Sequence, residues 1–170
     1  MDCRLMSPVT AERSMIRPGQ VADIEALATI WYDGWRDAHL GIVPEELIRA
    51  RSRASFAPRL RQALNEVRVA GPVGAPDGFV MLKDDELYQL YVAASARGAG
   101  VARALIADAE QQIARRGHAR AWLACAIGNS RAERFYDKCG WTNGGRMTVR
   151  LEIPTGECLL EVWRYEKALS

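Results

Sequence analysis

The apolar residues of this chain recur at helical spacing in two places. Between Val21 and Ala38 they return every three or four residues, at Ile24, Leu27, Ala28, Trp31 and Trp35. This spacing is typical of a helix with one buried face. Residues 101–113 show the same spacing and are followed by Arg115-Arg116-Gly117, whose cations and glycine suit a helix end. The pattern therefore predicts two long amphipathic helices.

Shorter apolar runs, rich in β-branched and aromatic residues, predict strands. The predicted strands are 14–17, 67–70, 79–82, 87–92 and 121–127, followed by a terminal hairpin of 146–153 and 158–165. A second helical region opens at Pro44, and we expect an interruption near Pro58. A short helix is expected to run from Asn129 through Lys138 and to close at Gly140. This order of elements predicts an α/β chain around a mixed sheet.

A length of 170 residues suits one domain with one core. Residues 1–13 show no clear periodicity, so we expect a flexible N-terminal arm followed by a single domain over residues 14–170. Met15 stands at the start of the first predicted strand, so we also consider the hypothesis that translation begins at Met15 rather than at Met1.

Composition excludes several classes of protein. Lysine and arginine number 23 against 21 acidic residues, and this balance provides no general field for nucleic acid or membrane lipid. The four cysteines lack CxxC spacing, so no metal site is expected, and no run approaches the roughly 20 apolar residues of a membrane span. The short basic run 115–120 suggests nucleic-acid binding but is explained more simply as a helix end. We expect a cytoplasmic protein without a secretory signal.

The segment Arg97-Gly98-Ala99-Gly100-Val101-Ala102 lies between a predicted strand and a predicted helix. Glycines let a ligand approach converging backbone N–H groups, the start of a helix adds unpaired N–H groups, and an arginine adds charge. The segment therefore predicts a pyrophosphate site. A dinucleotide fingerprint would need a glycine at Arg103, and a nucleotide-hydrolase loop would need Gly-Lys-Ser/Thr at residues 100–102. The remaining alternative is that the glycines only shape a tight turn.

Two motifs together resemble one known family. Leu90-Tyr91-Val92 followed by Arg97 to Ala102 resembles the central motif of the GCN5-related N-acetyltransferase (GNAT) family, whose pattern Arg97, Gly100 and Ala102 satisfy. The run from Asn129 to Trp141, with Phe135-Tyr136 and Gly140-Trp141, resembles the second motif of that family. The similarity in the order of elements extends over about Ser14 to Ala168.

This resemblance implies a mixed, mostly antiparallel central sheet with splayed central strands, flanked by helices. It implies transfer of the acetyl group of acetyl-CoA to a primary amine of a small molecule, or of a protein or peptide. The amine would attack directly, through a tetrahedral intermediate. The residues implied to contact the cofactor are Leu90, Tyr91, Val92, Arg97, Gly98, Ala99, Gly100, Val101, Ala102, Asn129 and Tyr136.

The resemblance also suggests catalytic roles. Tyr136 stands where the family often carries a general acid, although Phe135 and Tyr136 could instead only pack the core. Glu86 opens the central strand, where family members sometimes place a catalytic glutamate, while Asp84-Asp85-Glu86 also reads as a solvated turn. His39 lies in a region that shapes the acceptor pocket and has a pKa suited to a base, although a lone histidine is commonly structural.

The acceptor pocket is expected to involve Trp35, His39, Tyr88 and Gln89. Trp35 is a candidate for either the core or the pocket wall. Adjacent strand residues point to opposite faces, so only one of Tyr88 and Gln89 is expected to face the acceptor. The alternative function is a non-catalytic sensor that binds acyl-CoA. The terminal hairpin, with Leu159, Val162 and Trp163, also offers an edge for a homodimer.

Overall fold

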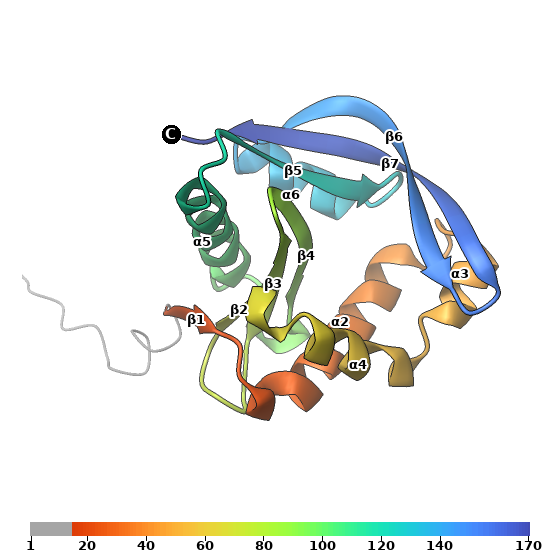
Figure 1. Ribbon diagram of the computed structural model, residues 1–170, viewed down its shortest axis with the longest axis horizontal. Helices are drawn as coiled ribbons and strands as arrows, with labels where there is room; N and C mark the ends of the chain where they lie inside the picture. The colour runs from red at the N-terminus through yellow and green to blue at the C-terminus, as the bar shows by residue number, and fades with distance from the viewer. Residues whose placement is uncertain (1–14) are drawn as a thin grey trace, which may run out of the picture.

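The computed structural model describes residues 15–170 and contains a seven-stranded sheet between two layers of helices (Figure 1). The arm predicted over residues 1–13 lies outside the described residues. The strands run in the order β1-β2-β3-β4-β5-β7-β6, and every neighbouring pair is antiparallel except β4 and β5. The strands are β1 (Ile16–Pro18), β2 (Val67–Ala70), β3 (Gly78–Lys83), β4 (Glu86–Val92), β5 (Arg120–Ala126), β6 (Thr142–Ile153) and β7 (Gly156–Ala168).

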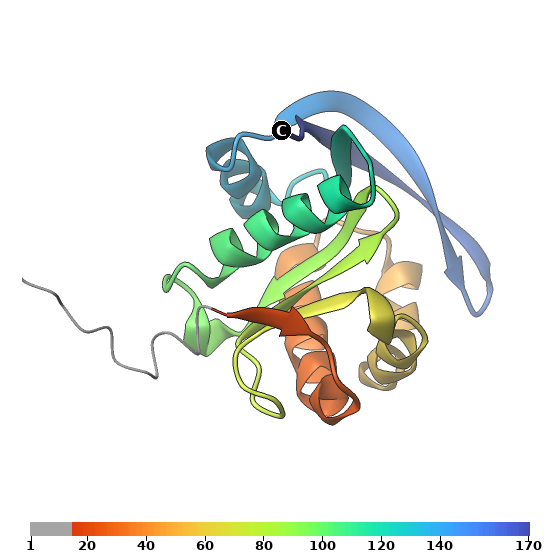
Figure 2. The same cartoon turned by 60° about the vertical axis from the view of Figure 1, so that its left-hand side comes forward.

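The helices separate into two layers, with α5 crossing one face of the sheet and α2 lying behind it (Figure 2). One layer consists of α2 (Ile24–His39), α3 (Glu45–Ala50) and α4 (Phe56–Gln62), and the other of α5 (Val101–Arg115) and α6 (Ser130–Lys138). Short 3-10 turns cover Val21–Asp23, Arg53–Ser55, Leu64–Glu66 and Ala94–Ala96. Within residues 15–170, no helix combines the length and the apolarity that crossing a membrane requires.

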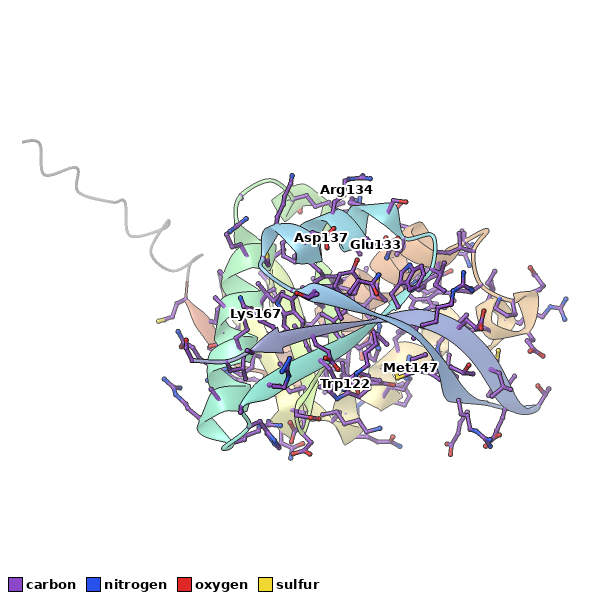
Figure 3. The ribbon with its side chains drawn as sticks, turned by 90° about the horizontal axis from the view of Figure 1, so that it is seen from above. Trp122, Glu133, Arg134, Asp137, Met147 and Lys167 are labelled. Carbon is purple, nitrogen blue, oxygen red and sulfur yellow. The ribbon has the colours of Figure 1, made fainter. Side chains whose placement is uncertain are left out.

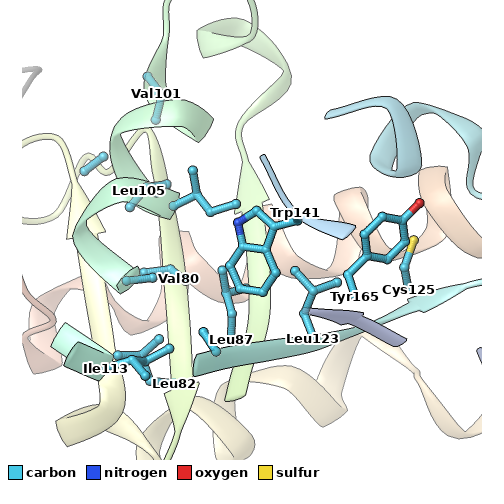
Figure 4. Close-up of a cluster of buried hydrophobic side chains, with 14 residues drawn as sticks. Val80, Leu82, Leu87, Val101, Leu105, Ile113, Leu123, Cys125, Trp141 and Tyr165 are labelled. Atoms are coloured by element: carbon cyan, nitrogen blue, oxygen red, sulfur yellow. The ribbon is translucent and has the colours of Figure 1, made fainter. Parts of the chain in front are cut away.

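Each helical layer forms its own hydrophobic core against the sheet. On the α5 side, Val80 and Leu82 of β3 pack with Leu105 and Ile113 of α5, and Trp141 closes the cluster (Figure 4). On the other side, Phe79 and Met81 pack with Trp31, Phe56 and Leu60. Because β3 is buried on both faces, its sequence is a nearly continuous run of apolar residues.

A β-bulge lies in β4 beside the centre of the sheet. Met81 pairs with Gln89 and the next residue, Leu82, pairs with Leu87, so Tyr88 is an extra residue without a partner on β3. A bulge of this kind bends its strand and re-aims the side chains next to it. Here it occurs where β4 leaves its neighbour β5.

The sheet opens between β4 and β5. Their register holds one pair, Glu86 with Trp122, and the amide of Trp122 donates to the Asp85 carbonyl at 3.2 Å. Beyond that point the β5-facing edge of residues 88–92 has no backbone partner among the described residues. The predicted splay of the central strands is therefore present.

Most of the predicted elements are confirmed, with differences at their ends. The interruption expected near Pro58 is wrong, because the helix breaks at residues 51–55 and Pro58 lies in the first turn of α4. Proline is tolerated there because the first N–H groups of a helix have no internal partner. The terminal hairpin is longer than predicted, since β6 starts at Thr142 and passes an irregularity between Asn143 and Arg146.

Candidate active site

A cavity of about 810 Å³ connects the two helical layers through the gap in the sheet. It is lined by the start of α5, all of β4 and the second half of β5, and continues to the ends of α2 and α3, to α4 and to the β6–β7 hairpin. In Figure 3, the labelled Trp122 and Met147 mark β5 and β6, two of the strands that contribute lining residues. One continuous space thus lies where the sequence predicts both a cofactor and an acceptor.

The glycine segment forms one mouth of this cavity. Gly98 and Gly100 have φ of 81° and 80°, in the left-handed region that favours glycine. An added Cβ at either position would meet nothing within 4 Å, so both face open space. Gly100 precedes α5, and no side chain among residues 15–170 caps this helix end, which leaves its first amides available. Of the six residues predicted here, all but Ala99 line the cavity.

Arg97 is held in an ion-pair cluster at this mouth. Its guanidinium lies 3.3 Å from the Asp37 carboxylate of α2, and Arg131 of α6 lies 3.1 Å from the same carboxylate. Arg131 and Arg103 also line the cavity. Sequence reasoning missed both of them, although Arg103 stands at the third position of the predicted helix and could have been found there.

The predicted backbone segment Leu90-Tyr91-Val92 lies along the gap and lines the cavity. The side chains alternate, with Leu90 and Val92 packing on the α5 side and Tyr91 on the α2 side. The Tyr91 ring rests on Gly34, where an added Cβ would lie 2.6 Å from its Cδ1 atom. This close approach between α2 and β4 explains a glycine in the middle of a helix.

Asn129 lines the cavity and also caps α6. Its side-chain oxygen accepts a hydrogen bond from the Ala132 amide at 3.4 Å, which is the capping alternative considered for this residue. One oxygen lone pair and the amide group remain for other partners.

Tyr136 both packs the core and borders the cavity. Its ring centroid lies 5.6 Å from that of Phe135 and 5.7 Å from that of Tyr165, and both Phe135 and Tyr136 line the cavity. Burial raises the pKa of Tyr136, so the phenol keeps its proton at neutral pH. Core packing and a contact with ligand are therefore compatible at this residue.

Glu86 is half-buried and lines the cavity, whereas the Asp84 side chain is 78% exposed. The solvated-turn interpretation thus describes Asp84 and not Glu86. Burial raises the pKa of Glu86 to about 7, and the charge of Asp85 adds to the rise while Lys83 opposes it. A carboxyl group with this pKa can accept a proton near neutral pH.

His39 ends α2 and lines the cavity beside Trp35. The two rings stack at 4.9 Å, and His39 Nδ1 lies 2.8 Å from the Trp35 carbonyl oxygen. A carbonyl can only accept, so Nδ1 carries the hydrogen, and Nε2 is an acceptor that has no partner within the described part of the chain. Burial lowers the pKa of His39, which favours this neutral form. Trp35 is 7% exposed and still lines the cavity, so it serves the core and the wall.

Tyr88 and Gln89 were expected to point to opposite faces of the sheet, so that only one of them could face the acceptor, and this expected alternation is wrong. Tyr88 packs with the α2-side cluster, and Gln89 is paired with Met81, which belongs to that same cluster. The bulge at Tyr88 breaks the alternation of faces, so both residues lie on the α2 side and both line the cavity.

Two arginines that line the cavity, Arg51 at the end of α3 and Arg59 of α4, were not anticipated. Cys125 of β5 lines the cavity as well. Burial raises the pKa of Cys125 to about 12, so its thiol stays protonated. The arginines lie in a run with Arg49, Arg53 and Arg61 that resembles an ordinary solvated surface.

Comparison with known proteins gives a consistent result. The model of the acetyltransferase (GNAT) family matches residues 24–141. An uncharacterized N-acetyltransferase of Mycobacterium tuberculosis is 35% identical over 105 residues, which cover 59% of this chain and 67% of that protein.

Solved structures agree with this match. A GCN5-related N-acetyltransferase from Rhodopseudomonas palustris has a TM-score of 0.70 and 27% identity, covering 91% of this chain and 95% of the other. The protein yncA of Salmonella typhimurium, solved with its cofactor acetyl-CoA, has a TM-score of 0.62 and 18% identity, covering 92% and 94%.

Proposed function

Because the chain belongs to the acetyltransferase (GNAT) family, we propose that it transfers the acetyl group of acetyl-CoA to a primary amine of a small molecule. The family and the cosubstrate are supported by the matching model and by structural neighbours with bound coenzyme A or acetyl-CoA. The enzymatic interpretation therefore replaces the non-catalytic sensor considered from the sequence.

The residues of the cavity fit acetyl-CoA. The uncapped start of α5 supplies amides for a pyrophosphate, and the positions of Gly98 and Gly100 leave the space that the phosphates need. The β5-facing edge of β4 leaves backbone groups that an amide-containing arm would satisfy as an added strand does. Arg97 and Arg103 add positive charge at this mouth.

The observation that carries the proposal is the single cavity joining this mouth to two ionisable groups. Glu86 and Tyr136 both line it, one with a pKa near neutrality and the other protonated. In the proposed reaction the amine nitrogen bonds to the acetyl carbon and the carbon–sulfur bond breaks. Glu86 accepts the proton that leaves the nitrogen, and Tyr136 donates a proton to the departing sulfur.

Two further roles complete the proposal. An N–H group among residues 90–92 would stabilise the developing oxyanion, as preorganised backbone donors do. His39, with its free Nε2, is the second candidate for the base. No covalent bond to the enzyme is required, because the amine attacks directly.

Calorimetry with acetyl-CoA and a screen of thioester consumption over an amine library test the function. Tyr136→Phe is expected to lower kcat by about 10²-fold or more with little change in the KM for acetyl-CoA. Tyr165→Phe is the matched control, because Tyr165 is a buried neighbour of Tyr136 that does not line the cavity. Failure to bind acetyl-CoA at millimolar concentration would contradict the function, and a fully active Tyr136→Phe variant would contradict the acid role.

A further inference from the structure

The part of the cavity on the α2 side of β4 is lined by two arginines, Arg51 and Arg59. We call it the distal half, and its walls are Trp35, Leu47, Arg51, Arg59, Leu151 and Leu160. Leu47 of α3 packs in one cluster with Leu151 and Leu160 of the hairpin, so this half is enclosed by α3, α4 and the hairpin, which Figure 1 shows on the same side of the molecule. Among the described residues that line any part of the cavity, Glu86 is the only one with a carboxylate.

Arg59 is positioned by aromatic rings rather than by an acid. Its Cζ atom lies 4.3 Å from the centre of the Trp31 ring and 5.6 Å from that of Phe56. Its Nη1 atom is buried and has no hydrogen-bond partner among residues 15–170. A buried donor without an acceptor is costly, and proteins rarely leave one unsatisfied.

Arg51 is half-buried at the end of α3 and also lacks an acid. The charged or ionisable groups that act on it are Arg59, Tyr88, Tyr91 and Cys158, and none of these is a carboxylate. Burial and the like charge of Arg59 both disfavour its charged form and lower its pKa. Two cations thus face the distal half, and neither is paired with a carboxylate from the described part of the chain.

The half-buried Arg36 likewise has no ion pair among the described residues, and its Cζ atom lies 5.5 Å from the centre of the Tyr32 ring. Arg17 and Arg68, which are also partly buried, are each paired with an acid. Arg17 lies 2.8 Å from Asp23, and Arg68 lies 2.8 Å from Asp108, each through two hydrogen bonds. The missing acid therefore sets Arg51 and Arg59, which line the cavity, apart from Arg17 and Arg68. Ring contacts account for the position of Arg59, but they leave its Nη1 donor and the charge of Arg51 unexplained.

A guanidinium presents a planar fork of donors that matches a carboxylate. We propose that Arg51 and Arg59 bind a carboxylate group of the acceptor, which makes the substrate a small aminocarboxylate. This inference rests on the proposed function and narrows its substrate class. The amine lies toward Glu86, the carboxylate lies toward the two arginines, and the apolar walls contact the carbon chain between them.

The test compares matched acceptors and matched variants of the full chain. Acetyl transfer is measured for α-, β- and γ-amino acids and for the corresponding amino acid amides, which keep the amine and lose the negative charge. We expect the best aminocarboxylate to exceed its amide by about 10- to 100-fold in kcat/KM, the range of a lost charged hydrogen bond. Arg51→Gln should remove most of this preference by raising the KM for the acceptor, while the KM for acetyl-CoA stays unchanged.

Arg61→Gln is the control, because Arg61 lies on α4 with its side chain 58% exposed and is paired with the exposed Glu25. Arg51→Lys keeps the charge without the fork, so we expect an intermediate preference. Arg59→Gln also removes ring contacts, so a loss of folding there is judged by its melting curve and the conclusion rests on Arg51. Equal rates for acids and amides, or a preference unchanged in Arg51→Gln, would overturn the inference while leaving the transferase function intact.

A binding measurement tests the carboxylate site separately from the proposed acetyl transfer. Calorimetry is carried out on the coenzyme A complex with two ligands, the best aminocarboxylate and the same acid without its amine. Both should bind, and Arg51→Gln should weaken their binding by about tenfold or more. If this binding occurs without acetyl transfer, the carboxylate site stands and the proposed reaction is wrong. If neither acid binds, or if a peptide with an acidic side chain is acetylated better than every free aminocarboxylate, the inference is wrong.

Discussion

Glu86 combines two properties that its place in the fold explains. As the first residue of β4 it shares a register pair with Lys83 and another with Trp122, so it stands where the sheet begins to open. The opening creates the cavity, and partial burial in that cavity raises the pKa of Glu86 to about 7. The same loss of solvent that disfavours the carboxylate makes it a stronger base.

This pKa predicts the pH dependence of the reaction. A base acts in its deprotonated form, so kcat/KM should rise with pH and level off above about 7, the pKa of Glu86. Glu86→Gln should remove that inflection and lower the plateau by roughly 10²- to 10⁴-fold. Rates of both proteins are measured with the same acceptor, so that titration of the acceptor amine contributes equally to the two profiles.

His39 provides the comparison. Its pKa is lowered from the ordinary value of 6.5, so a rate that depended on it would level off below that pH. His39→Gln should leave the inflection near 7 in place if Glu86 is the base. If His39→Gln lost the inflection and Glu86→Gln kept it, His39 would be the base and Glu86 would not.

The backbone conformation of the turn before α5 matters both for the stability of the fold and for the proposed binding of acetyl-CoA. Gly100→Ala introduces a side chain at φ of 80° without a steric contact, so its cost is the backbone strain of about 1–2 kcal/mol. Relief of that strain would turn the first amides of α5 away from the cavity. We expect acetyl-CoA binding to weaken by about tenfold or more, measured by calorimetry.

Gly117→Ala is a control on the same helix. Gly117 follows the other end of α5 with φ of 91° and nothing within 4 Å of an added Cβ. It should cost a similar free energy of unfolding without changing the affinity for acetyl-CoA. Equal losses of affinity in both variants would show that the glycines only stabilise the fold, which is the tight-turn alternative.

The elements themselves were largely predictable, because local patterns specify them. Helix α5 follows from the spacing of Val101, Leu105 and Ile113, all buried as expected. The bulge at Tyr88 was not predictable, because it is defined by the pairing of β4 with β3 and leaves no mark in the alternation of either strand. Its effect on Tyr88 and Gln89 was therefore missed.

The candidate site was predictable where a motif lies within one stretch of chain. The cavity mouth from Arg97 to Ala102 belongs to one such stretch, and Asn129 and Tyr136, at the start of α6 and within it, belong to another. Arg51 and Arg59 do not, because only the packing of α3 and α4 against the hairpin brings them to the cavity. A sequence shows their charge but not the absence of an acid beside them.

The sheet of the protein consists of two halves that are joined by few backbone pairs. Strands β1–β4 form one half and β5–β7 the other, and β4 and β5 share one register pair. Helix α5 contacts strands of both halves, and Phe135 of α6 packs against the same core that contains Leu105 of α5. A ligand that enters the gap would therefore contribute to cohesion between the halves as well as to its own binding.

This arrangement predicts how the protein responds to coenzyme A. Saturation at about 100 times the Kd should add roughly 2.7 kcal/mol to the free energy of unfolding, visible as a higher Tm. Hydrogen exchange should slow at the amides of residues 98–103 and along the open edge of β4, residues 88–92. A coenzyme A fragment that carries the phosphates without the pantetheine arm is the control, and it should protect residues 98–103 alone. If intact coenzyme A also protects only residues 98–103, its arm does not enter the gap, and β4 cannot position the thioester.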